Sequence, residues 1–249
     1  MGLSMTQLGD SRRFSDPMQQ ANRVSADEIV LDLPPATEDR ARRALNILVA
    51  LVGLVLAAPV MLLIAIAIKL TSRGPVFYTQ TRVGLDRRIR GEGNLNRRRN
   101  ADIGGLPFEI YKFRTMRVNA ETGGAAVWAS KDDPRVTPIG GFLRQYRLDE
   151  LPQLINVLKG DMNIVGPRPE RPQIFAELRE TIEQYPLRQR AKPGITGLAQ
   201  VSQSYDSCVE DVRKKVEFDL RYLRRQGLAE DLKIMLKTIP VILFRKGGW

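Results

Sequence analysis

The feature that most constrains this chain is a run of 24 residues, 45–68, with no charged side chain and one strongly polar one, Asn46. As a helix the run would extend about 36 Å, enough to cross the hydrocarbon core of a bilayer. Pro59 divides it into 14 and 10 residues, each too short to span, and a proline inside a helix kinks the backbone. The run is flanked on both sides by cations, namely Arg40, Arg42, Arg43, Lys69 and Arg73. The positive-inside rule therefore gives both ends the same preference, and the residues allow either a spanning helix or a re-entrant helix broken at Pro59.

The residue types that the chain lacks narrow its chemistry. It has no histidine and one cysteine, Cys208, which excludes an intrachain disulfide, a cysteine-rich zinc site and the Ser-His and Cys-His nucleophile systems. An enzyme of this composition must use carboxylates, lysine, tyrosine, hydroxyls or a cation with oxygen ligands, for which Mg²⁺ is the default. The net charge is +11, and the excess lies after the apolar run, because residues 1–70 hold 7 basic and 7 acidic side chains whereas 71–249 hold 32 and 21. Such a basic body suits nucleic acid, an anionic membrane or phosphorylated substrates.

Two adjacent carboxylates, Asp149 and Glu150, stand where an apolar-periodic segment begins, with Arg144 and Arg147 just upstream. The spacing predicts that both acids lie in the first turn of a helix. Unpaired N–H groups and the helix dipole attract anions there and lower the pKa of a carboxylate. One interpretation is structural, an N-cap and a first-turn acid. The other is functional, a nucleophile or metal ligand in a site for phosphate.

Two further segments carry cations toward this pair. Residues 108–116 alternate as a strand with Lys112 and Arg114 on one face, and cations on a buried strand need anionic partners, either in the protein or in a ligand phosphate. Thr137 and the proline after it suit the start of a helix that runs to about Tyr146. That helix would deliver Arg144 next to Asp149.

The chain divides into three parts by composition. Residues 1–40 indicate a disordered arm, 41–72 the membrane helix and 73–249 the catalytic domain. Within that domain, residues 85–105 form an inserted basic loop, which is either a solvated surface excursion or a contact for anionic lipid headgroups. Residues 228–246 predict an amphipathic helix that lies on a membrane surface or packs on its own domain.

In order and spacing, these residues resemble the bacterial sugar transferases, or monotopic phosphoglycosyl transferases, over about residues 40–245. The matching stretches are Gly74-Pro75-Val76-Phe77, Gln80, Arg82-Val83-Gly84, Lys112-Phe113-Arg114-Thr115-Met116, residues 149–162, Val165-Gly166-Pro167-Arg168-Pro169 and Lys192-Pro193-Gly194-Ile195-Thr196-Gly197. The resemblance implies an α-rich mixed α/β fold. A re-entrant helix broken at Pro59, a small β element and amphipathic interfacial helices would surround an active site on the cytoplasmic face of the bacterial inner membrane.

The resemblance also implies a reaction. Asp149 would attack the β-phosphate of a UDP-sugar, release UMP and form a glycosyl-phosphoryl aspartate, which polyprenyl (undecaprenyl) phosphate then attacks in a ping-pong sequence. Glu150 would be its essential partner, and Asp149 and Glu150 would hold Mg²⁺. Arg144 and Arg168 would bind substrate phosphate, and Lys112 and Arg114 are weaker candidates for the same pocket. The product would initiate assembly of a glycoconjugate such as exopolysaccharide, O-antigen, capsule or glycoprotein. The implied partners are the donor, the lipid acceptor and the bilayer, without nucleic acid, and a homodimer is compatible with this.

Two positions depart from the family pattern. Ala58 precedes the proline where some members have serine, and the 85–105 insertion replaces a tight turn. We expect a minimal form without a large N-terminal membrane domain or a sensor domain. An alternative from another class is a membrane-tethered basic scaffold that binds anionic lipid or nucleic acid. It is motivated by the net charge and the arginines at 97–99, but bases interleaved with stacking aromatics are absent and aromatics make up only 6% of the chain.

Overall fold

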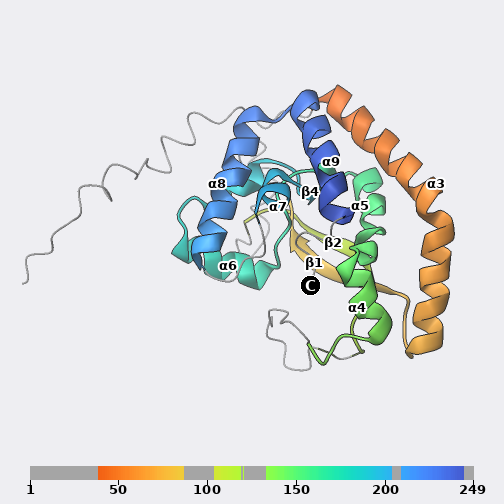
Figure 1. Ribbon diagram of the computed structural model, residues 1–249. Helices are drawn as coiled ribbons and strands as arrows, with labels where there is room; N and C mark the ends of the chain where they lie inside the picture. The colour runs from red at the N-terminus through yellow and green to blue at the C-terminus, as the bar shows by residue number, and fades with distance from the viewer. Residues whose placement is uncertain (1–38, 87–103, 119, 121–132, 204–208, 244–249) are drawn as a thin grey trace, which may run out of the picture. The chain divides into compact units, whose positions relative to one another are not determined.

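Helices surround two small sheets in the computed structural model, which describes residues 39–86, 104–118, 120, 133–203 and 209–243 (Figure 1). In chain order the elements are α3 (Arg40–Thr71), β1 (Phe77–Val83), β2 (Pro107–Phe113), α4 (Pro138–Gln145), η2 (Leu148–Glu150), α5 (Gln153–Lys159), β3 (Asn163–Val165), α6 (Pro172–Thr181), η3 (Tyr185–Arg190), β4 (Gly194–Thr196), α7 (Leu198–Ser202), α8 (Val209–Arg225) and α9 (Leu228–Leu243). The expected helix-rich fold with a small β component is confirmed. The predicted arm before Asp39 and residues 87–103 of the predicted insertion lie outside the described residues.

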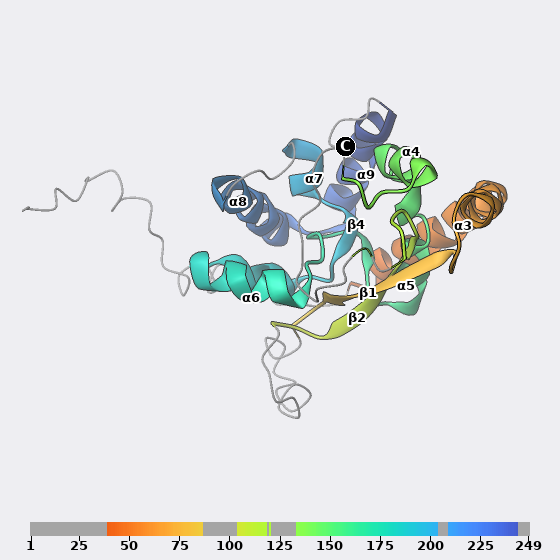
Figure 2. The same cartoon turned by 90° about the horizontal axis from the view of Figure 1, so that it is seen from below.

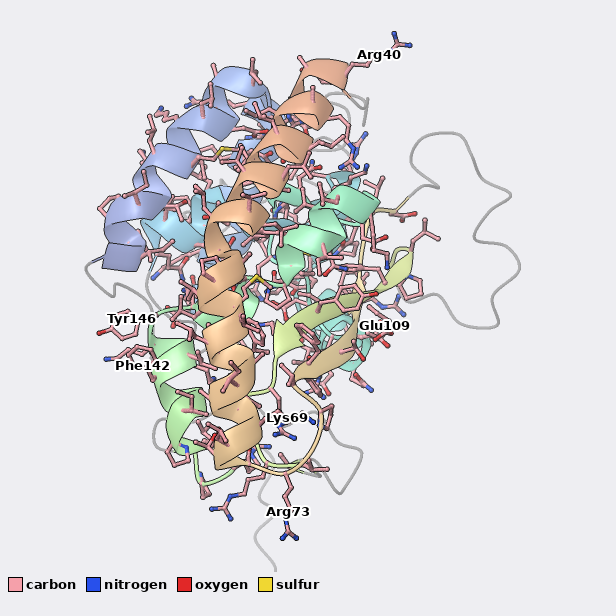
Figure 3. All side chains as sticks on the ribbon, turned by 90° about the vertical axis from the view of Figure 1, so that its right-hand side faces the viewer. Arg40, Lys69, Arg73, Glu109, Phe142 and Tyr146 are labelled. Atoms are coloured by element: carbon pink, nitrogen blue, oxygen red, sulfur yellow. The ribbon has the colours of Figure 1, made fainter. Side chains whose placement is uncertain are left out.

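The apolar run forms α3, a helix of 32 residues that continues through Pro59. The structure therefore does not contain the predicted break at this proline. Proline removes one backbone hydrogen bond but has a φ compatible with a helix, so a curved, continuous helix can accommodate it. The ribbon of α3 bends along its course in two views (Figures 1 and 3). Among the described residues, α3 is the helix long and apolar enough to cross a membrane by length and composition.

One face of α3 packs on the rest of the domain, mainly on α5. Its buried residues form two groups, each with a spacing of four that places its members on one side of the helix. They are Arg42, Asn46 and Ala50 in the first half and Ile64 and Ile68 in the second. Ile64 and Ile68 join Phe113 and Leu143 in one core cluster. The other face is apolar and exposed, with Val55, Leu56 and Leu70 at 73, 72 and 81% exposure.

Both ends of α3 are hydrogen-bonded to the same domain. Near the start, Arg42 donates to Asp231 on α9 (2.9 Å) and to the Tyr222 hydroxyl on α8 (2.7 Å). Arg43 donates to the Val157 and Leu158 carbonyls at the end of α5 (2.6 and 2.9 Å). At the other end, Arg114 donates to the Ser72 and Arg73 carbonyls (2.9 and 2.7 Å). The helix is thus held at each terminus by the body on which it packs.

The first sheet is a pair of antiparallel strands, β1 and β2, which the predicted insertion connects. The strand predicted over 108–116 ends earlier, at Phe113, opposite Phe77, where β1 begins. Beyond it Met116 forms an isolated bridge with Val136, and the Arg114 guanidinium bonds the end of α3. Figure 2 shows this pair from below, with α5 beside it.

The second sheet joins β3 and β4 in parallel. Beside these strands the two chain segments approach so closely that a Cβ on Gly166, the residue after β3, would collide with the Lys192 carbonyl oxygen, which explains why glycine stands there. The loop that carries Arg168 begins at Gly166.

Two of the predicted helices are found with small changes of boundary. Thr137 is the N-cap of α4, accepting a hydrogen bond from the Gly140 N–H (3.0 Å), and Pro138 is the first residue of the helix, as predicted. The helix predicted over 228–246 is α9, and residues 244–246 lie outside the described part. Asp231 and Ile234 of α9 are fully buried, whereas Leu236 is 67% exposed, so the helix is amphipathic.

The anchor of α3 leads to a first prediction. Asp231→Ala leaves the buried Arg42 guanidinium without its anion, and we expect the free energy of unfolding to fall by about 3–5 kcal/mol. Thermal unfolding in detergent measures this. The double variant Arg42→Met/Asp231→Leu removes both charges, and we expect it to be more stable than the single variant. A double variant as unstable as Asp231→Ala would contradict a role for the ion pair.

Candidate active site

Asp149 and Glu150 lie in η2, a 3-10 turn between α4 and α5, and not in the first turn of a longer helix as predicted. The flanking residues explain the difference. The backbone of Arg147 has the left-handed conformation (φ 53°, ψ 23°), which separates η2 from α4. The N-cap of α5 is Pro152, so both acids precede that helix. Both carboxylates are directed inward, with residue exposures of 7 and 6%.

Glu150 is surrounded by cations from separate parts of the chain. Arg168, in the loop after β3, donates to both of its oxygens (2.6 and 3.3 Å). Lys112 of β2 donates to Oε1 (3.0 Å), and Arg147 lies 3.9 Å from the same atom. Such charge-assisted hydrogen bonds offset the cost of burying a carboxylate. Glu150 therefore orients two cations at the centre of the site.

Asp149 is bound far more loosely. Its Oδ2 lies 3.7 Å from the Lys112 amine, a distance that makes an ion pair but is too long for a hydrogen bond. Within the part of the chain that the structure describes, no donor lies within hydrogen-bond distance of its carboxylate oxygens. A buried carboxylate next to cations but not bonded by them retains its lone pairs for another reactant.

The pKa values of the two acids move apart. Burial raises the pKa of Asp149, an effect that Lys112 opposes and the neighbouring Glu150 charge reinforces. Burial acts the same way on Glu150, but Arg168 and Lys112 outweigh it and hold the pKa of Glu150 well below its ordinary range. The expected lowering is thus found for Glu150 alone, and its cause is side-chain cations and not a helix dipole. A raised pKa makes the Asp149 carboxylate the more basic of the pair.

The structure brings together most of the residues predicted for the site. Lys112 and Arg168 contact the carboxylates directly. Arg144, in the last turn of α4, interacts electrostatically with Asp149. Arg114 is not in this cluster, because its guanidinium points to the end of α3 and bonds the Ser72 hydroxyl (2.8 Å) as well as the carbonyls there. We therefore assign Arg114 to the attachment of α3.

Behind the cluster lies a buried ion pair that the sequence did not indicate. Arg188, fully buried in η3, donates to Asp219 of α8 (2.6 Å), to the Tyr185 hydroxyl (2.8 Å) and to the Arg168 carbonyl (3.0 Å). Burial disfavours its charge, yet Tyr185 and Asp219 outweigh that effect and raise the pKa of Arg188. The hydrogen bond from Arg188 to the Arg168 carbonyl fixes the backbone of Arg168. Arg188 stands beside Arg190 in a polar stretch, so only its burial distinguishes it from a surface cation.

Comparison with known proteins identifies the family. The family model described as "Bacterial sugar transferase" matches residues 37–245, which is most of the chain. The chain belongs to the bacterial sugar transferases. A relative from Escherichia coli (strain K12), a UDP-glucose:undecaprenyl-phosphate glucose-1-phosphate transferase, is 42% identical over 200 residues, 80% of this chain and 39% of its own length. The relative of the same name from Caulobacter vibrioides is 40% identical over 213 residues, 85% of this chain and 73% of its own.

Relatives of this sugar transferase are named for different sugars. The UDP-N-acetylgalactosamine-undecaprenyl-phosphate N-acetylgalactosaminephosphotransferase of Aeromonas hydrophila is 41% identical over 202 residues, which is 81% of this chain and 43% of its own length. The chain thus spans about two fifths of the Escherichia coli and Aeromonas proteins.

The surroundings of the two carboxylates indicate which of them could bind the expected magnesium ion. In the described ranges no three Asp, Glu, His or Cys side chains are grouped as metal ligands. Mg²⁺ bound by one or two carboxylates, waters and substrate phosphates does not need such a group. Both oxygens of Glu150 accept hydrogen bonds from cations, whereas those of Asp149 do not. The residues present fit a metal held by Asp149 together with a substrate diphosphate better than one held by both acids.

The opposite pKa shifts predict opposite effects on stability. Glu150, whose folded pKa lies below its ordinary 4.5, stabilises the fold above that pH and loses this contribution as the pH falls through the folded value. We expect Glu150→Gln to lower the free energy of unfolding at neutral pH by about 2 kcal/mol, and the deficit to shrink in acid. Asp149→Asn removes a charge that burial disfavours, so it should not lower stability.

Thermal unfolding of both variants and the parent from about pH 2 to 8 checks this pair of expectations, because the Glu150 contribution is lost below pH 4.5. The two variants are matched, because each replaces one carboxylate by its amide in the same turn. Equal losses of stability would show that the two acids are held alike, against the geometry.

Proposed function

We propose that this enzyme transfers a sugar-1-phosphate from a UDP-sugar to undecaprenyl phosphate and releases UMP. The names of the relatives support the donor and acceptor classes. The observation that carries the proposal is the pairing of a buried, weakly bound carboxylate, Asp149, with cations that Glu150 orients. The alternative of a basic scaffold gives no reason for cations directed into a buried acidic pair.

Two displacements at the same phosphorus account for the transfer. In the first, an Asp149 carboxylate oxygen attacks the β-phosphorus, the bond from that phosphorus to the oxygen bridging the α-phosphate breaks, and UMP leaves. In the second, a phosphate oxygen of the lipid attacks the phosphorus, and the bond to Asp149 breaks. The products are the lipid diphosphate sugar and the original carboxylate. Such covalent catalysis divides one difficult displacement into two.

The surrounding side chains have separate roles in this scheme. Lys112, 3.7 Å from Asp149, and Arg168 would stabilise negative charge on the transferring phosphoryl group. Arg144 would contact the leaving UMP from α4. Glu150 keeps Lys112 and Arg168 in place and is not itself a reactant. Asp149 would also hold Mg²⁺, which supplies electrostatic stabilisation of the diphosphate when bound.

A direct prediction concerns the nucleophile. Asp149→Asn should reduce UMP release from UDP-sugars by about 10⁴-fold or more, because the amide cannot form the acyl phosphate. The assay uses detergent-solubilised protein, undecaprenyl phosphate and a panel of UDP-sugars. Mass spectrometry of the parent, incubated with donor alone, should detect a phospho-sugar adduct on Asp149.

Three controls make this assay decisive. The amide variant should keep its membrane association and thermal stability. Chelation with EDTA should stop UMP release by the parent, and added Mg²⁺ should restore it. Retained turnover in Asp149→Asn would refute the covalent step, and turnover in EDTA would refute the need for a metal.

We further propose that the domain sits on the cytoplasmic face of the bacterial inner membrane with α3 re-entrant. A straight helix of 32 residues would extend about 48 Å and put one end beyond the far side of the hydrocarbon core. Arg42 at one end and Ser72 at the other bond the same domain, which supports entry and exit on one side. Apolar side chains on the open face of α3 are accompanied by exposed Leu236 of α9 and Phe142 of α4. Figure 3 shows α9 and α4 beside α3, with Phe142 projecting from α4.

Labelling from the two sides of the membrane tests this topology. In a Cys208→Ser background, Arg40→Cys and Arg73→Cys place single thiols at the two ends of α3. We expect an impermeant maleimide to label both in inverted vesicles and neither in intact spheroplasts. Glu210→Cys on α8 marks the side of the catalytic domain. Labelling of the two α3 ends from opposite sides would establish a spanning helix instead.

A further inference from the structure

Asn156 is fully buried on α5 and has no part in the reaction described above, yet it links the two elements that meet at the active site. Its Oδ1 accepts a hydrogen bond from the Tyr111 N–H (3.0 Å), and its Nδ2 donates to the Glu109 carbonyl (2.7 Å). Both partners are main-chain groups of β2. They lie two residues apart, on the edge of β2 that β1 leaves open.

This pair of bonds reproduces one rung of a parallel sheet. A residue of a neighbouring parallel strand donates to one carbonyl and accepts from the N–H two residues further along. The Asn156 amide makes the same two contacts from a helix. Aspartate lacks the donor, leucine lacks both groups and glutamine is one methylene longer, so the side chain fixes the position of β2 along its own direction.

Lys112 follows Tyr111 directly, so the position of β2 sets where the Lys112 amine lies. That amine is 3.0 Å from Glu150 Oε1 and 3.7 Å from Asp149 Oδ2. Glu150 belongs to η2, six residues before Asn156, and η2 leads through Pro152 into α5. The amide therefore ties the strand that carries the cation to the helix that follows the carboxylates.

We propose that Asn156 is a positioning residue, whose amide holds β2 on α5 in the register that places Lys112 between Asp149 and Glu150. The inference rests on the proposed function only in that Lys112 serves the transfer. The other charged groups that face Asp149 are Glu150 from the same turn, Arg168 from the loop after β3 and Arg144 from α4. None of these is carried by β2, so loss of the Asn156 amide acts on Lys112 selectively.

The first test reads the position of Lys112 without reference to activity. Full-length protein in detergent is treated with an amine-acylating anhydride, and the modification of each lysine is followed by mass spectrometry. We expect Lys112 to be acylated severalfold faster in Asn156→Ala than in the parent, while Lys233, already 57% exposed, serves as the internal standard. Thr238→Val, which removes a side-chain hydrogen bond between α9 and β4, is the matched control and should leave Lys112 protected. Unchanged protection in Asn156→Ala would overturn the proposal.

The second test separates positioning from general stabilisation. Asn156→Ala should lower kcat for UMP release by about 10–100-fold, since small displacements of a catalytic group have effects of this size, and change KM little. Combined with Lys112→Met, it should cause less than a twofold further loss, because the amide acts through the lysine. Fully multiplicative losses would refute the mechanism.

Two further comparisons keep both tests interpretable. If the alanine variant does not fold, Asn156→Ser and Asn156→Gln, which retain a polar group, replace it in both experiments. The labelling result stands even if the parent releases no UMP, so failure of the proposed function and failure of this inference are distinguishable.

Discussion

The burial of Glu150 is the constraint on which the site depends. A carboxylate that is 6% exposed is costly unless cations bond it, and here Lys112 and Arg168 supply those bonds. Lys112 comes from β2 and Arg168 from the loop after β3, and they lie 38 and 18 residues from Glu150 along the chain. The strand β2, the turn η2 and the loop after β3 must all be in place before the charge is satisfied. The same ion cluster therefore completes the fold and assembles the candidate active site.

The chain has no histidine, and this determines how the site sets the pKa values of its two acids. Without a side chain that titrates near neutral pH, the site separates its two acids by environment: burial dominates for Asp149, and cations dominate for Glu150. One carboxylate is left basic and weakly bound, and its neighbour serves as a fixed anion. A buried second layer, Arg188 with Asp219, extends the support to the backbone of Arg168.

Much of the site could be predicted from the sequence, because its main residues are marked locally. Asp149 and Glu150 are adjacent, and Thr137 and Pro138 signal the helix that carries Arg144. Alternation placed Lys112 and Arg114 on one face, but it cannot reveal that the strand ends between them. Arg114 was therefore predicted in the same pocket as Lys112, whereas its guanidinium bonds the end of α3. The left-handed backbone conformation of Arg147 could not be predicted either, since nothing in its side chain requires that conformation. Arg188 and Asn156 depend on long-range packing, for which a single sequence carries no periodic signal.

The attachment of α3 also has a bearing on how this enzyme can be handled. Asn46, the one strongly polar residue of the apolar run, accepts a hydrogen bond from the Ile164 N–H on β3 (2.7 Å), and Arg43 bonds the carbonyls that end α5. The apolar helix α3 is therefore a structural part of the domain on which it packs and not a detachable segment. Cutting the chain before β1 to obtain a water-soluble fragment would leave the Ile164 N–H of β3 and the carbonyls at the end of α5 without these partners. Solubilisation has to preserve the helix, with detergent or lipid covering its outer face.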